Sequence, residues 1–591
     1  MRALLAAFLL ALSPATPAQP SVSPQQVEAL MALAKTHGVV RYFHPSDSLD
    51  LVAWDRFLVH AAERMGSTPD AEAMGRRLEE LFAPIVDGFR VAPPGAPAAA
   101  PEGEGPRVEW RHLGYGLETD ASSPYASWRT HHDPLRDGKV KGGFFQHRVP
   151  AEQVAAADAV MRISITRSLE AQVPVSMPMS ATKVGAEQKA RLDALAKRLE
   201  GVQVASDPVP RAQAHADGIA LWNVARHFYP YWAEVKVDWD AALRKWLAAQ
   251  PETQTRAQLR DSLLRLAEPL EDGHGGIQDP KDSVGRAFLG VSVRPLGRQW
   301  VVDSSRVQEK ARAGDVIVSI RGKPAAQWFE ERMALISGSP QHKHWQARFS
   351  LMSGPRESTV SVRLERLGRI HDVTLAYDSP RPLQSPRPPA ISEIATGVFY
   401  VDVTRFEKAA FEKQLDPLRA AKGIVFDLRG FPTRDAVALV PYWITQEDKA
   451  QWMLVPRFDK PLAQFDTGWS FGWQLPRKAD LDKPVKVLIT DGRAFDYAES
   501  LAAYFPAQKT GPVLGEATAG AAGNVARATL PSGMGFFFSA MRVSRHDGTA
   551  PLHRAGVAPD EVVVPTLTGM RNGRDDLLER ATAVIQARAA R

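Results

Sequence analysis

Four short segments of this sequence combine glycine with side chains that can transfer protons or attack a substrate. They are Glu271-Asp272-Gly273-His274-Gly275-Gly276, Asp427-Leu428-Arg429-Gly430-Phe431-Pro432, Asp491 to Ser500, and Gly515 to Gly520. An imidazole such as that of His274 titrates near neutrality and suits proton transfer. The carboxylates Asp427, Asp496 and Glu499 leave acid–base work on a glycoside open as a further hypothesis.

The elements that carry three of these segments alternate between apolar strands and helices. We predict strands at 397–402, 423–427, 485–490 and 512–515, with helices at 408–419, 433–443 and 497–505. Short apolar strands separated by helices indicate an α/β layer with largely parallel pairing. In such a layer, function lies where loops leave the strand ends, which is where these three segments stand.

The first segment precedes about ninety residues of predicted strands, at 286–378. Their Gly-rich opening and the run Gly314-Asp315-Val316-Ile317-Val318-Ser319-Ile320-Arg321-Gly322 resemble a PDZ domain. In that fold, an exposed strand edge captures a peptide terminus by β-addition, with backbone amides holding the carboxylate. The resemblance implies peptide binding at Leu289, Gly290 and Val291.

An internal repeat organises the first half of the chain. Val40-Arg41-Tyr42-Phe43-His44-Pro45 precedes Trp54-Asp55, and Ala225-Arg226-His227-Phe228-Tyr229-Pro230 precedes Trp239-Asp240, with thirteen residues from Arg to Trp in both. Apolar residues at helical spacing flank each copy. We predict two helical hairpins, at 19–91 and 210–282, whose aromatic residues either border a substrate cleft or pack the turn.

A Pro/Ala linker at 92–106 and a predicted β-rich insert at 107–190 separate the two copies. The insert contains His131, His132 and His147, which lack the spacing of metal ligands. We therefore expect surface histidines, and neither a metal nor a cofactor.

Composition narrows the class of protein. The chain of 591 residues has no cysteine, which excludes thiol catalysis, and its length predicts several domains. Its 73 basic and 67 acidic residues are mixed along the sequence without a basic block, which gives nucleic-acid binding little support.

The first residues predict export. Arg2 precedes the apolar run 3–12, and small residues follow up to position 18, as in a secretory signal peptide. The run is too short to span a membrane, and no later stretch is long enough. We expect residues 1–18 to be removed and the protein to be periplasmic or extracellular.

Together, the four segments in this order around a PDZ-like domain resemble the tail-specific, or C-terminal-processing, serine peptidase family and its tricorn-core relatives. The resemblance covers roughly residues 215–575. It implies an α/β peptidase core at 392–575, a ClpP/crotonase-like layer, that hydrolyses unfolded polypeptides or protein C-termini without a cofactor.

The resemblance also implies roles for single residues. His274 corresponds to the general base, and backbone N–H groups at Gly430, Phe431, Thr433 and Tyr497 would face the oxyanion. Relatives often have Gly-Gly where this chain has Thr433-Arg434. The lysine that serves as base in the processing-protease branch is missing, because residues 519–524 read Ala-Gly-Ala-Ala-Gly-Asn.

The nucleophile departs from the family pattern. Relatives have serine three residues before a glutamate, and here Asp496 stands three residues before Glu499. An aspartate attacking an amide would form an anhydride less stable than the substrate. Ser500 is an alternative, about 6 Å further along the helix axis. Asp496 also suits an N-cap, in a capping box with Glu499.

Two hypotheses of function remain from the sequence. One is an exported serine peptidase of the tail-specific family. The other is a catalytically dead pseudo-peptidase that binds peptides on the same scaffold. The sequence leaves the oligomeric state open.

Overall fold

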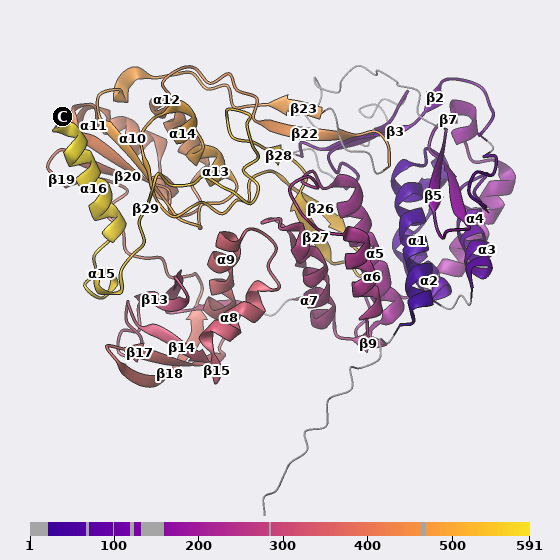
Figure 1. Ribbon diagram of the computed structural model, residues 1–591, viewed down its shortest axis with the longest axis horizontal. Coiled ribbons are helices and arrows are strands. Elements are labelled where there is room, and N and C mark those ends of the chain that lie inside the picture. The colour runs from indigo at the N-terminus through magenta and orange to yellow at the C-terminus, as the bar shows by residue number, and fades with distance from the viewer. Residues whose placement is uncertain are drawn as a thin grey trace, which may run out of the picture.

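The computed structural model describes residues 22–66, 70–98, 100–118, 123–131, 159–282, 285–461 and 468–590. The helical N-terminal part, a middle domain of strands and two helices, and a C-terminal α/β core occupy different parts of the molecule (Figure 1). The predicted signal peptide, His132 and His147 lie outside the described residues. Within the described residues, no helix has the length and apolarity needed to cross a membrane.

The two aromatic motifs lie side by side at the ends of paired helices. α1 (Pro24–Phe43) and α2 (Trp54–Met65) flank the first motif, and α5 (Arg211–Phe228) and α6 (Trp239–Ala248) flank the second. The rings of Phe43 and Phe228 stack with centroids 6.5 Å apart, and both are buried. These two rings pack the turns, and α3 (Ala71–Phe82), α4 (Ala186–Leu199) and α7 (Arg256–Ala267) complete the helical part.

The strands predicted between the two repeats do not form one separate domain. β3 (Trp110–Leu113) and β4 (Ala126–Arg129) join a sheet with β22 (Met453–Phe458) and β23 (Gly468–Phe471), more than 300 positions later. The remaining short strands pair near the N-terminal helices: β1 (Arg90–Ala92) with β6 (Glu170–Pro174) and β5 (Val160–Ser164), β2 (Arg107–Val108) with β7 (Met177–Pro178), and β8 (Val209–Pro210) with β9 (Thr253–Gln254).

The middle domain is an antiparallel sheet whose edge strand is β12. Its strands are β11 (Arg286–Leu289), β12 (Val291–Leu296), β13 (Gln299–Ser305), β14 (Val316–Ile320), β15 (Lys323–Pro324), β16 (Ser353–Pro355), β17 (Thr359–Arg366) and β18 (Arg369–Ser379). Two helices, α8 (Ala325–Met333) and α9 (Pro340–Met352), interrupt these strands, and α9 packs against β12. Leu289 and Val291 point into this domain's hydrophobic core.

The core sheet has the order β19-β20-β21-β24-β25-β29 and is parallel except at β19. Its strands are β19 (Ile391–Ala395), β20 (Val398–Asp402), β21 (Gly423–Asp427), β24 (Val485–Thr490), β25 (Val513–Gly515) and β29 (Glu561–Val562). The four predicted core strands correspond to β20, β21, β24 and β25. The carboxyl ends of β21, β24 and β25 lead into the Asp427, Asp491 and Gly515 segments.

The predicted core helices are shorter than expected. Two of the three segments contain a proline, Pro417 or Pro441, and Pro506 directly follows the third. Proline has no N–H to continue the helical hydrogen bonding. Residues 408–419 form α10 (Lys408–Lys413) and α11 (Leu415–Ala420), with Pro417 in the second. Residues 433–443 form a 3₁₀ helix followed by α12 (Val440–Trp443). Residues 497–505 divide into α13 (Tyr497–Ala502) and α14 (Tyr504–Gln508).

The core extends beyond the predicted boundary at residue 575. After α15 (Leu567–Arg571), α16 (Asp576–Ala589) lies against the sheet and buries Leu577, Ala581 and Ile585 against Val398, Val425 and Val487. These apolar side chains cover a sheet face that would otherwise be exposed to water.

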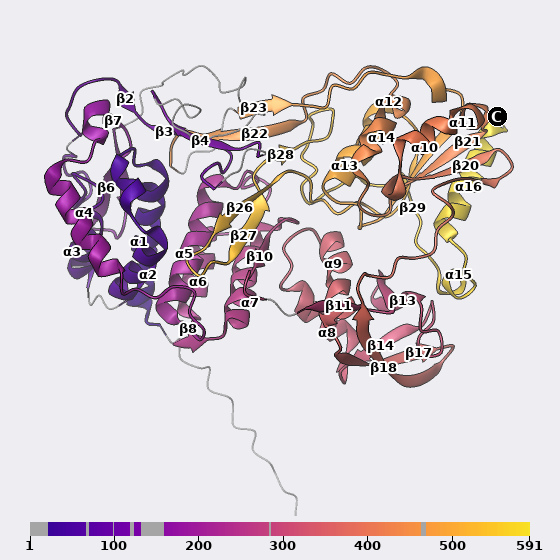
Figure 2. The ribbon, with the colours of Figure 1, turned by 180° about the vertical axis from the view of Figure 1, so that it is seen from behind.

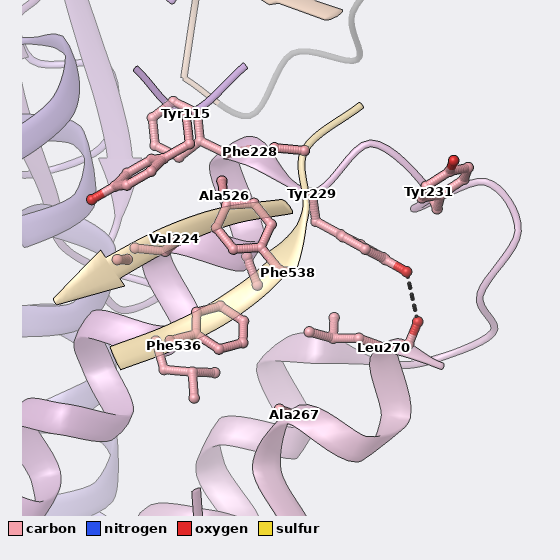
Figure 3. Packing of buried hydrophobic residues seen from close by; sticks show 14 of the residues in the cluster. Tyr115, Val224, Phe228, Tyr229, Tyr231, Ala267, Leu270, Ala526, Phe536 and Phe538 are labelled. Carbon is pink, nitrogen blue, oxygen red and sulfur yellow. Dashed lines mark hydrogen bonds between the residues drawn. The ribbon is translucent and has the colours of Figure 1, made fainter. Parts of the chain in front are cut away.

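Three short strands connect the helical part to the core. β10 (Gly276–Gln278) pairs antiparallel with β27 (Gly535–Ser539), which pairs with β26 (Val525–Thr529), as Figure 2 shows. Phe536 and Phe538 of β27 pack among the aromatic side chains of the second motif (Figure 3). Tyr229 donates a hydrogen bond to the carbonyl of Leu270 at 2.8 Å. The aromatic motif therefore supports the segment that leads into His274.

Ile585→Ala tests whether α16 is part of the core. Removing this buried side chain should lower the free energy of unfolding by about 2–5 kcal/mol, measured by urea denaturation. Gln586→Ala changes an exposed neighbour on the same helix and serves as the control. Equal midpoints for the two variants would contradict the extended boundary.

Candidate active site

The position of His274 follows from the pairing of β10 with β27. Gly276 lies opposite Phe537, so continuing the same register places His274 opposite Ser539. The imidazole Nδ1 lies 2.9 Å from Ser539 Oγ. Gly273 packs so closely that a Cβ there would meet the Cβ of Ala521 at 2.2 Å. Only glycine permits this approach.

The buried carboxylate of Asp272 orients the imidazole through Ser539. It accepts hydrogen bonds from the Ser539 amide at 2.6 Å, the Ser539 hydroxyl at 2.8 Å and the His274 amide at 3.0 Å. Because the Ser539 hydroxyl gives its only proton to Asp272, it must accept one from His274 Nδ1. The other ring nitrogen, Nε2, is then the one that can take a proton from a reacting group.

Asp496 faces that nitrogen. Its Oδ1 lies 3.9 Å from His274 Nε2, longer than a hydrogen bond. The residue stands in the turn between β24 and α13, with φ 54° and ψ −115°. A non-glycine residue in such a conformation carries about 1–3 kcal/mol of strain. A sharp strand-to-helix turn of this kind displays the nucleophile in other hydrolases.

The predicted capping box at Asp496 is wrong. Its side chain makes no cap hydrogen bond to α13, and its own amide donates to the carbonyl of Ala521 at 3.0 Å. The carboxylate of Glu499 is bound to another loop and does not reach back to residue 496. The Asp496 carboxylate is therefore held in front of the imidazole and does not serve the helix end.

Burial raises the pKa of Asp496, while the nearby charge of His274 and the amides of Gly523 and Tyr497 act in the opposite direction. With Nδ1 protonated, neutral His274 would present a lone pair to the carboxylate, and these two acceptors repel each other. A proton placed on either group removes the repulsion. The geometry therefore places a carboxylate opposite an imidazole nitrogen, at a separation too long for a direct hydrogen bond.

Glu499 binds the loop that follows β25. Its carboxylate accepts hydrogen bonds from the Thr518 hydroxyl and from the amides of Gly520 and Ala521, the last two at 2.6 Å. The side chain is fully buried, and burial raises its pKa to about 7. Glu499 thus positions the loop whose Ala521 carbonyl receives the Asp496 amide.

The predicted oxyanion residues differ in what their polar groups contact. The Gly430 amide donates to the carbonyl of Leu428 at 2.9 Å and is therefore engaged within its own loop. The Thr433 hydroxyl donates to the carbonyl of Phe406 at 2.8 Å. The amide of Tyr497 faces the Asp496 carboxylate. The backbone donor of Tyr497 thus points at the candidate reacting group.

Aromatic rings line the cleft beside the candidate nucleophile. The half-exposed Phe431 has its ring centroid 5.1 Å from that of Phe495. The Phe495 centroid in turn lies 6.5 Å from that of His274. Tyr497 accepts a hydrogen bond from the Val437 amide at 2.8 Å, which fixes the 3₁₀ segment Arg434–Leu439 beside the helix start.

The alternative nucleophile Ser500 lies on the same helix and is buried. The two ring nitrogens of His274 are directed at Ser539 and Asp496. Neither faces Ser500, so the imidazole is not placed to activate that hydroxyl. The catalytic assignments of His274 and Asp496 remain predictions.

A second histidine at the site was missed by the sequence analysis. His342, near the start of α9, is buried beside Gly273. Burial, then the charge of His274, lowers its pKa to about 4, so it is neutral at pH 7 and does not compete for the proton. No local motif marks it, because it reaches the site only through the docking of α9. In the described residues, no group of three or more His, Asp or Glu side chains could hold a metal ion.

Comparison with known proteins places this geometry in context. The family model described as peptidase family S41 matches residues 397–563. The solved structure of mature CPAF complexed with lactacystin is similar, with a TM-score of 0.51 and 12% identity over 64% of this chain and 98% of that chain. The photosystem II D1 C-terminal processing protease is 19% identical, covering 61% and 97% of the two chains, with a TM-score of 0.37. No curated protein matches the sequence.

Glu499→Gln tests the buried carboxyl. Its pKa of about 7 in the folded protein lies above the ordinary 4.5. The folded state therefore binds more protons between these values, and the free energy of unfolding falls as pH rises through them. In urea denaturation from about pH 4.5 to 7, the free energy of unfolding of the variant should fall less steeply with pH than that of the unmodified chain.

Asp217→Asn provides a separate reference, because burial also raises the pKa of Asp217 to about 7. In Asp217→Asn, the part of the pH dependence that comes from Glu499 should remain, and the part that comes from Asp217 should be lost. A pH dependence in Glu499→Gln identical to that of the unmodified chain would exclude a raised pKa at Glu499.

Proposed function

This chain belongs to peptidase family S41, and on that premise we propose that it binds unstructured polypeptide in a peptidase cleft that lacks a competent nucleophile. The observation that carries the proposal is Asp496. Its carboxylate occupies the strained turn opposite His274 Nε2, where a peptidase of this family has serine.

The chemistry of a carboxylate explains why cleavage is not expected. Attack by Asp496 on a peptide bond would form an anhydride less stable than the amide it replaces. Ser539 is within hydrogen-bond distance of His274, but it contacts Nδ1 and its proton is committed to Asp272. The imidazole, its orienting carboxylate and the Tyr497 amide are in place, and the nucleophilic hydroxyl is missing.

Polypeptide binding is supported by the arrangement of the middle domain, which we propose is PDZ-like. Among the described residues, β12 pairs only with β13, so its other edge is available for β-addition. α9 packs against β12 and forms the second wall of a groove. Leu289 and Val291 are buried, so recognition at 289–291 would use backbone groups. An extended segment satisfies this geometry.

We also propose that the protein is exported to the periplasm or beyond. The charged start and the apolar run at 3–12 support this. Expression in a Gram-negative host followed by fractionation and N-terminal mass spectrometry should recover the chain outside the cytoplasm, beginning near residue 19. A cytoplasmic chain that keeps residues 1–18 would contradict export.

Restoring a serine tests the missing nucleophile. Asp496→Ser should cleave a fluorophore-quenched unfolded polypeptide at least about 10³-fold faster than the unmodified chain, because one group is missing from an assembled site. The double variant Asp496→Ser/His274→Ala should return to background. Asp496→Ala is the matched control, because it removes the carboxylate without supplying a hydroxyl.

Two results would overturn the proposal. Cleavage by the unmodified chain that disappears with Ser500→Ala would place the nucleophile at Ser500. Cleavage by the unmodified chain that disappears with both Asp496→Asn and His274→Ala would show that the pair activates water.

A further inference from the structure

A cavity of about 320 Å³ opens between the middle domain and the core, next to the candidate active site. Ser292 of β12 and Trp345, Arg348 and Phe349 of α9 line one side. The core contributes Gly430, Phe431, Gly492, Arg493 and Phe495 to the other side. The groove between β12 and α9 therefore leads to the residues that border Asp496.

All of the charged residues that line this cavity are arginines: Arg348, Arg387, Arg405, Arg429 and Arg493. Four of them have carboxylate partners behind the cavity wall. Arg387 and Arg405 contact Asp402, Arg429 contacts Asp427 and Asp575, and Arg493 contacts Asp491. Arg348 has no carboxylate within salt-bridge distance in the described part of the chain, and its Nε lacks a hydrogen-bond partner.

Two other guanidinium groups lie near Arg348, each with a carboxylate partner of its own. Its guanidinium lies 5.1 Å from the ring centroid of Trp345, and those of Arg294 and Arg493 lie at the same distance from that ring. Burial, then the charge of Arg493, lowers the pKa of Arg348 to about 9, while the charges of Asp491 and Asp303 act in the opposite direction. Arg348 therefore remains charged at neutral pH, and among the described residues neither carboxylate lies within salt-bridge distance of it.

Trp345 holds this cluster against the active-site turn. A Cβ at Gly492 would lie 2.1 Å from Trp345 Cδ1, so the indole packs directly on the backbone that leads to Asp496. A group bound at Arg348 is thereby held at a fixed position relative to that turn.

We propose that Arg348 binds a carboxylate of the polypeptide lying in the groove between β12 and α9. The proposal rests on the proposed function and specifies its ligand. A guanidinium forms two parallel charge-assisted hydrogen bonds with a carboxylate, and desolvation in the cavity strengthens them. The carboxylate belongs either to an Asp or Glu side chain or to the C-terminus of the bound segment.

A buried arginine without a carboxylate partner destabilises the folded protein when no ligand is bound. Such a loss of stability is common at binding sites. Arg348→Met keeps much of the aliphatic volume and removes the charge. Its melting temperature should equal or exceed that of the unmodified chain. This result would separate a role in binding from a role in folding.

Fluorescence anisotropy with three labelled, unstructured twelve-residue peptides tests the ligand. The first has a free C-terminal carboxylate and no acidic side chain, the second is its C-terminal amide, and the third is the amide with one internal glutamate. At low salt, the first or the third should bind the unmodified chain about tenfold more tightly than the second. Which of the two does so identifies the source of the carboxylate.

Arg348→Met should abolish the preference for a carboxylate. This variant should bind all three peptides with the affinity that the unmodified chain has for the second peptide. Arg348→Lys should retain part of the preference. Arg363→Met, which removes an exposed arginine paired with Asp372 on the far strands of the middle domain, should leave it unchanged. Binding without discrimination, or a preference that survives Arg348→Met, would overturn this inference and leave the proposed function standing. Binding of none of the peptides would overturn both.

Discussion

The buried carboxylate of Asp272 is the group on which the site depends. Buried charge is tolerated only where hydrogen bonds replace water, and Asp272 obtains three from Ser539 and the His274 amide. These bonds join a loop of the helical part to a strand of the core. The Asp272 amide also donates to Ser337 of the middle domain at 2.9 Å. All three parts of the molecule therefore meet at this residue.

That convergence orients the imidazole of His274, the predicted base, toward the carboxylate of Asp496. The Ser539 hydroxyl defines the tautomer of His274 and directs Nε2 into the cleft. The turn at residue 496 keeps a strained conformation that a simple helix cap does not require. Strain of this kind persists where the surrounding structure holds it, here through the Ala521 carbonyl and the loop bound by Glu499. These contacts hold the Asp496 carboxylate in place opposite His274.

Helix α9 gives the middle domain a direct part in the cleft. Its first turn brings His342 beside Gly273, and Ser339 donates to the carbonyl of Ala519. About one and two turns later, respectively, Trp345 and Arg348 line the cavity that reaches Phe431 and Phe495. One helix therefore contacts the loop of the candidate base and the groove where polypeptide is proposed to lie.

The sequence by itself determined the four core strands, the order of the four glycine-containing segments and the presence of Asp496 where the family has serine. These are local properties, readable from apolar runs and from residues within a few positions. The tertiary structure decided what depends on register and docking: Ser539 opposite His274, His342 and Arg348 at the cleft, β3 beside β22, and α16 on the sheet. The capping box failed for the same reason. The Glu499 carboxylate accepts hydrogen bonds from buried amides about twenty residues later in the sequence. Hydrogen bonds to these desolvated amides stabilise the fold more than a solvent-exposed bond at the helix end would.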